Sequence, residues 1–257
     1  MKYSGLYFIP NQTSQPADSS NTASALISSL ETHFHTFTRS SPWTLTYRLF
    51  RDQQPKSDPS DAPASYAHTY QHFLTHTSLS QVRAFIHVAL PTGTGSVTAI
   101  PASQSDAHAL LVRNQFAALW SPRQTLSVQH GATYTGGIFT VEIGEVRAIR
   151  EAQGGGFSSP GVVVCISTVA GQEDSGAASD SAKDGDAEQM DLEFVQATIR
   201  ELWGKIREGH DLRKAEVREV LMTPEAETER EVEDATVRMW TRKAIKHQAS
   251  SIKIIKA

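Results

Sequence analysis

The sequence predicts an α+β protein: an antiparallel β-barrel of about eight strands, flanked by helices and followed by a charged C-terminal helical extension. Residues 123–170 contain three β-rich segments, which glycines at positions 136–137 and 154–156 separate. Glycine tolerates positive φ and therefore tight reversals, so these segments predict an antiparallel meander. Apolar residues at helical spacing recur in three other stretches and predict three helices.

The first 100 residues predict a strand, a helix and four further strands. Residues 3–9 form a short apolar strand that ends at Pro10. A helix begins at Asn21, whose side chain can cap it, and carries Leu26, Leu30, Phe34 and Phe37. Strands follow at residues 43–50, 69–77, 82–90 and 96–100, and three prolines (Pro55, Pro59, Pro63) mark a loop after the first of these.

A second helix is expected at residues 106–120, where Pro122 stops it. Its apolar surface is wide, because it includes Leu110, Leu111, Phe116, Leu119 and Trp120. We therefore expect this helix to pack against more than one neighbour.

The middle strand of the meander changes the parity of its apolar positions. Phe139, Val141 and Ile143 alternate onto one face, whereas Val146 and Ala148 have the opposite parity. A β-bulge at Gly144-Glu145 would accommodate one extra residue and coil the strand toward barrel closure. The alternative is an ordinary strand that ends at Gly144.

Composition divides the chain into four parts. Residues 1–170 hold 10 of the 24 Lys and Arg residues and 9 of the 28 Asp and Glu residues, and predict the barrel with two helices. Residues 171–189 lack large apolar side chains and predict a flexible acidic linker. Residues 190–208 predict a helix that packs on the barrel or a partner through Leu192, Val195, Ile199, Leu202 and Ile206. Residues 209–257 form the charged helical extension.

The overall composition argues against several classes of protein. The net charge of −4 and the absence of a strongly basic region argue against bulk nucleic-acid binding. No apolar run approaches the length of a membrane span, and the N-terminal apolar run is too short for a signal peptide. Cys165 is the single cysteine, which excludes an intrachain disulfide and fits a reducing compartment. We therefore expect a soluble, intracellular protein.

Ten histidines raise the question of a metal site. His68, His72 and His76 share one face of the predicted strand, but successive imidazoles are about 13 Å apart, too far to share an ion. His33 and His35 lie near the end of the first helix, where the helix dipole tolerates a charged imidazole. The sequence predicts no metal ligands, no cofactor-binding residues and no catalytic residues.

Glu142 and Glu145 are the only acids close together in the meander. Acids three apart on a strand face opposite sides unless a bulge realigns them, and a metal-dependent phosphohydrolase needs several inward carboxylates. The glycine runs lack the residues of a phosphate loop, and no nucleophile elbow occurs. Arg242, Lys243 and Lys246 form a weak basic cluster that is more typical of a solvated helix face than of an import signal.

Four segments together resemble a known family. They are GLYFIP at residues 5–10, NQFAALWSPRQTLSVQHGATYTGGIFTVEIGEVR at 114–147, GVVVCIS at 161–167 and DLEFVQATIRELW at 191–203. With these segments, residues 1–207 resemble fungal subunit 20 of the Mediator of RNA polymerase II transcription. The acidic segment 171–189 and the tail after Gly209 depart from the compact pattern of that family.

The resemblance implies a nuclear, non-enzymatic transcription coregulator of the Mediator head module. It implies a barrel akin to tunnel-type RNA triphosphatases without their acid-lined tunnel. The partners it implies are subunit 18 as a heterodimer, a helix of subunit 8 and other head-module subunits. RNA polymerase II would be contacted indirectly, and neither a membrane nor a specific DNA sequence would be bound.

Two alternatives remain open: a triphosphatase-like phosphohydrolase and a free-standing ligand-binding barrel. Inward carboxylates would favour the first, a large apolar cavity the second, and a packed interior the Mediator subunit. The sequence does not predict which residues form the interface.

Overall fold

The computed structural model describes residues 2–11, 16–54, 66–93, 95–149, 157–169, 184–209 and 218–222. The strands are β1 (Lys2–Pro10), β2 (Thr38–Arg39), β3 (Trp43–Asp52), β4 (Tyr70–His76), β5 (Arg83–Ala89), β6 (Ser96–Pro101), β7 (Trp120–Gly136), β8 (Phe139–Ile149), β9 (Phe157–Val169) and β10 (Arg218–Met222). The helices are α1 (Pro16–His33), the 3-10 turn η2 (Ala102–Gln104), α2 (Ser105–Asn114) and α3 (Asp184–Ile206).

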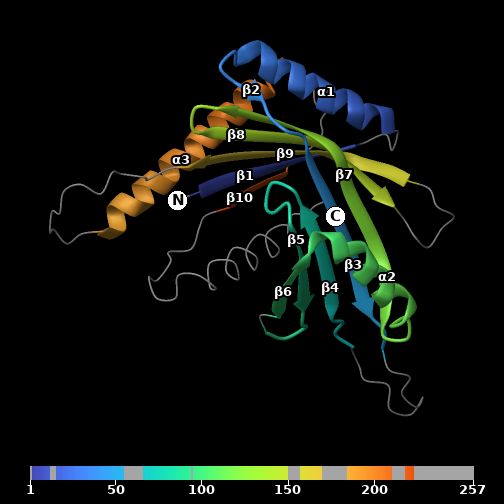
Figure 1. The fold of residues 1–257 in the computed structure, drawn as a ribbon. Helices are drawn as coiled ribbons and strands as arrows, with labels where there is room; N and C mark the ends of the chain where they lie inside the picture. The colour runs from blue at the N-terminus through green and yellow to red at the C-terminus, as the bar shows by residue number, and fades with distance from the viewer. Residues whose placement is uncertain are drawn as a thin grey trace.

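All ten strands belong to one antiparallel sheet, which confirms the α+β prediction (Figure 1). The order is β10-β1-β9-β8-β7-β3-β4-β5-β6, and β2 pairs with β7 outside this path. The predicted barrel of about eight strands is wrong in two respects: the sheet of the described residues has ten strands, and it does not close. Its described ends are β10 and β6.

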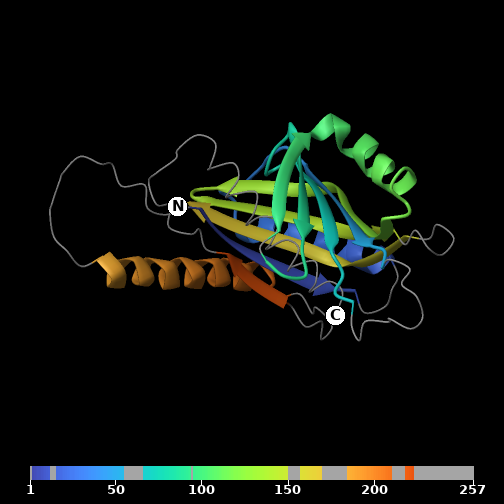
Figure 2. The ribbon, with the colours of Figure 1, turned by 90° about the horizontal axis from the view of Figure 1, so that it is seen from below.

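The sheet folds over on itself instead of joining its edges. In Figure 2 the strands β4, β5 and β6 cross over the long strands β7, β8 and β9. The register of β7 with β8 shifts between Ser127 and Ala132, and such a shift bends a strand. As a result Phe8 of β1 and Tyr47 of β3 belong to one buried cluster. Side chains therefore fill the space between the two halves of the sheet, which face each other without pairing their edges.

Three buried clusters organise the core. The first lies between the sheet and the helices α1 and α3, and includes Leu26, Leu30, Val141, Val164 and Ile199. The second lines the concave face of the sheet, which we call the interior, and includes Phe8, Trp43, Tyr47, Leu74, Phe85 and Val146. The third lies under α2 and includes Phe50, Phe73, Ile86, Ala109 and Val112.

Strand β8 is buried on a different face in each half, which explains the change of parity. Val141 and Ile143 pack under α1 and α3, whereas Val146 and Ala148 pack in the interior. The register with β9 runs unbroken from Phe139 to Val146 and shifts only between Val146 and Ala148. The bulge at Gly144-Glu145 and the strand end at Gly144 are therefore both wrong.

Several predicted boundaries also differ. α1 begins at Pro16, so Asn21 lies inside the helix and does not cap it. α2 ends at Asn114, and Trp120 and Pro122 belong to β7, since β3 pairs with this segment.

The C-terminal regions are only partly described. α3 begins at Asp184, within the segment predicted to be a linker, and β10 is a strand within the segment predicted to be helical. The rest of the linker prediction, at residues 171–183, lies outside the described residues, as do residues 210–217 and 223–257 of the predicted extension. Within the described part of the chain, none of the helices combines the length and apolarity that a membrane span requires.

Candidate protein interface

Helix α2 buries one stripe and leaves a second apolar surface exposed. Ala109 and Val112 are buried against Phe50, Phe73 and Ile86 of the sheet. Large apolar side chains on the other side of the helix and in the following turn are exposed: Leu110 by 56%, Leu111 by 43%, Phe116 by 44% and Leu119 by 59%. We call these four residues the α2 patch. The four residues lie within positions 110–119 of the chain, and exposed large apolar side chains that gather in this way are typical of an interaction site.

Hydrogen bonds hold the turn that carries Phe116 and Leu119. The backbone N–H groups of Leu119 and Trp120 both donate to the carbonyl of Phe116, at 2.9 Å. Gln53, just beyond β3, donates from Nε2 to the carbonyl of Ala117 at 2.6 Å and from its backbone N–H to that of Leu119 at 2.8 Å. The α2 patch is therefore preorganised, which lowers the entropic cost of binding a partner.

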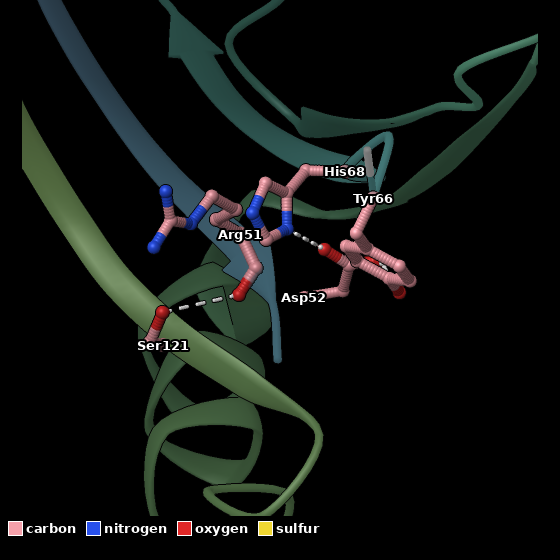
Figure 3. Close-up of polar contacts among 5 residues, drawn as sticks. All are labelled: Arg51, Asp52, Tyr66, His68 and Ser121. Atoms are coloured by element: carbon pink, nitrogen blue, oxygen red, sulfur yellow. Dashed lines mark hydrogen bonds and ion pairs between the residues drawn. The ribbon is translucent and has the colours of Figure 1, made fainter. Parts of the chain in front are cut away.

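A polar cluster fixes the end of β3 next to Gln53 (Figure 3). Asp52 accepts hydrogen bonds from Tyr66 Oη at 2.8 Å and from His68 Nδ1 at 2.7 Å. On the other side, Ser121 Oγ of β7 donates to the carbonyl of Arg51 at 3.2 Å. Burial raises the pKa of Asp52, but hydrogen bonds from the Thr69 backbone, His68 and Tyr66 outweigh this effect and hold the pKa below its ordinary value. Both carboxylate oxygens of Asp52 accept a hydrogen bond, so the cluster fixes the end of β3 to the segment before β4. We call this cluster the Asp52 clamp.

The structure separates the three histidines of the predicted face. His72 and His76 are buried in the interior, whereas His68 precedes β4 and binds Asp52. The His72 ring stacks on His87 of β5 with centroids 5.5 Å apart, and Tyr47 Oη lies 2.8 Å from His72 Nδ1. At the end of the first helix, His33 Nδ1 lies 2.9 Å from the Ser29 carbonyl. Among the described residues, no group of three His, Cys, Asp or Glu side chains could hold a metal ion.

Sequence reasoning did not single out Tyr47 or His87. His72 and His87 are direct partners in the β4–β5 register, on either side of a short turn. Counting outward from the turn at residues 78–80 pairs His72 with Ile86, one position away from its observed partner, so the exact register came only from the structure.

Glu142 and Glu145 face opposite sides of β8, as their spacing predicts for an unbroken strand. Glu142 points into the interior and accepts a hydrogen bond from the Ser78 hydroxyl. Glu145 lies on the other face beside Arg147, with 3.4 Å between their charged atoms. Glu142 is the one buried carboxylate among the residues that the structure describes. The basic cluster Arg242, Lys243 and Lys246 lies outside that part of the chain.

Side chains pack the interior closely. Trp43 lies against the backbones of Gly131 and Gly144, and its ring stacks on His76 with centroids 5.2 Å apart. Leu74, Phe85 and Val146 are buried in the same cluster. A packed interior is the arrangement expected of an assembly subunit.

Comparison with known proteins identifies the family. The family model described as "TATA-binding related factor (TRF) of subunit 20 of Mediator complex" matches residues 1–230. No curated protein matches the chain. Among solved structures, the PH1819 protein from Pyrococcus horikoshii OT3 is 12% identical, with a TM-score of 0.34, over 78% of this chain and 89% of that one. That likeness is too low to carry an argument. The family match covers most of the sequence, and the chain therefore belongs to the family of Mediator complex subunit 20.

Proposed function

We propose that this protein is a non-enzymatic assembly subunit of the Mediator head module, which binds subunit 18 as a heterodimer and a helix of subunit 8. It would act in the nucleus on RNA polymerase II transcription through protein contacts alone. The family is generally non-enzymatic and nuclear, which supports this proposal. Fungal origin stays a prediction, since the match does not distinguish among members.

The α2 patch is the observation that carries the proposal. Leu110 and Leu119 are each more than half exposed, yet hydrogen bonds hold the turn that carries Leu119 in place. A rigid apolar surface on a non-enzymatic subunit is best explained by a partner that covers it. The packed interior supports the same reading, because its space is taken by buried side chains such as Tyr47 and Leu74.

Co-expression with a subunit 18 homologue, followed by size-exclusion chromatography, tests the proposal. We expect the two proteins to elute together as a one-to-one complex. Purified alone, the chain should self-associate or have low solubility, because the α2 patch is then uncovered. A lone protein that stays monodisperse and shows no affinity for the partner would contradict the proposal.

The phosphohydrolase alternative is tested separately. We expect release of phosphate from a nucleoside triphosphate or triphosphate-ended RNA to stay at background with Mg²⁺ or Mn²⁺, since such chemistry needs several inward oxygen ligands. Turnover that Glu142→Gln abolishes would overturn the non-enzymatic assignment.

A further inference from the structure

The two described edges of the open sheet differ in charge. The β10 edge carries Arg218 and Glu219, and Glu219 pairs with Arg200 of α3 at 3.2 Å. The β6 edge reads SVTAIP and carries no charged residue. Charged side chains protect edge strands from pairing with other chains, whereas neutral and β-branched residues favour such pairing. The β6 edge is therefore the less protected one.

Strand β6 has a regular backbone along its length, which another extended chain can pair with. Its register with β5 runs without a shift from Arg83↔Pro101 to Val88↔Ser96, so no bulge twists the edge away. Val97 packs against the interior cluster and Ile100 against the cluster under α2, which anchors both faces of the strand. No described strand pairs with its outer side, so alternate backbone N–H and C=O groups point outward there.

We propose that β6 is a strand-addition site, at which an extended, uncharged segment of a partner Mediator subunit joins the sheet. A row of outward N–H and C=O groups is satisfied along its length only by another extended chain, so the chemistry of the edge selects the class of partner. This inference rests on the proposed function, because it assumes that the chain assembles with other subunits.

Charge decides which extended segment fits. Between positions 82 and 101 the chain has one charged residue, Arg83, apart from its histidine. Val82 and Leu90, at the two ends of β5, are exposed by 72% and 51%. The chain's own residues 171–257 are dense in charge, with 14 Lys and Arg and 19 Asp and Glu, and match this neutral edge poorly. A neutral segment with β-branched side chains from another subunit matches it better.

Hydrogen exchange measured by mass spectrometry tests the site, with the co-expressed subunit 18 homologue as the probe. In the complex, we expect exchange of the amides at residues 96–101 to slow at least about tenfold relative to the lone chain, because added backbone hydrogen bonds protect them. Ala99→Lys places a charge on an exposed edge position and should weaken binding about tenfold. Thr32→Lys, on the exposed end of α1, is the matched control and should bind like the wild type.

The outcomes separate the two proposals. A complex that forms without slower exchange at β6 overturns strand addition and leaves the proposed function standing. Slow exchange at β6 in the lone chain, whether constant or dependent on its concentration, also overturns strand addition, because the chain itself or a second copy then covers the edge. A failure to form any complex contradicts the proposed function first, and the inference with it.

Discussion

The indole ring of Trp43 lies against the backbone of Gly131, its register partner across β3 and β7. A Cβ atom on Gly131 would be 2.2 Å from Nε1 of Trp43, far inside van der Waals contact. The two residues sit where β7 shifts its register and where the interior begins. Glycine at position 131 thus lets the largest side chain of the interior pack flat on the sheet.

Gly131→Ala should lower the free energy of unfolding by about 1–3 kcal/mol, because Trp43 must leave its position to make room. Urea unfolding followed by tryptophan fluorescence measures this change. Gly204→Ala is the matched control, since nothing lies within 4 Å of a Cβ at this position in α3. It should raise the free energy of unfolding by about 0.5–1 kcal/mol through helix propensity. Equal effects of the two substitutions would show that the Trp43 contact does not matter.

Tyr47→Phe should reduce stability by about 1–2 kcal/mol, because it removes a buried hydrogen bond to the imidazole of His72. Burial also raises the pKa of the Tyr47 hydroxyl, which keeps it protonated and able to donate. A double-mutant cycle with His72→Phe measures the coupling by thermal unfolding. Strict additivity of the two substitutions would contradict a direct interaction.

Asp52→Asn should reduce stability at neutral pH by an amount that shrinks in acid. The folded-state pKa of Asp52 lies below its ordinary value of 3.8, so the ionised carboxylate stabilises the fold. This contribution is complete above the ordinary pKa and is lost as the pH falls through the lower, folded-state value. Urea unfolding of both proteins at a series of pH values from 7 down to about 2 checks this. A difference that stays constant or grows in acid would contradict the assigned clamp.

Leu202→Asp should be strongly destabilising, because Leu202 is 7% exposed in the cluster between α3 and the sheet. An unpaired charge in an apolar cluster costs several kcal/mol. Phe194→Asp on the same helix is the control, since Phe194 is 71% exposed and should tolerate the charge. Thermal unfolding compares the two, and a similar loss in both would mean that α3 does not dock through this face.

Local patterns in the sequence predicted most of the fold. Alternating apolar residues located the strands, and the stripe through Val195, Ile199 and Leu202 located the helix that packs on the sheet. The errors arose where contacts between residues distant in the sequence determine the secondary structure or the buried face of an element. Trp120 continues a helical pattern locally, but pairing with Asp52 places it in a strand. Val146 and Val141 differ in parity because two clusters bury opposite faces of one strand, which no local rule reveals.

The α2 patch was less predictable than the fold. The sequence showed that the apolar surface of α2 is wide, but not which side the sheet would bury. The sheet buries the side of α2 that carries Ala109 and Val112, whereas Leu110 and Leu119 remain exposed at the surface. The Asp52 clamp depends on Tyr66 and His68, which lie 14 and 16 positions away in the chain and meet the carboxylate only after β3 and β4 pair.

The most direct test of the central claim is the affinity of the α2 patch for a subunit 18 homologue, measured by calorimetry. The variant Leu110→Asp/Leu119→Asp changes two exposed residues of the patch, and Phe194→Asp changes an exposed apolar residue elsewhere. We expect the double variant to keep the thermal stability of the wild type and to bind at least about tenfold more weakly, while Phe194→Asp binds normally. A folded double variant that binds as tightly as the wild type would contradict the claim that this patch carries the assembly function.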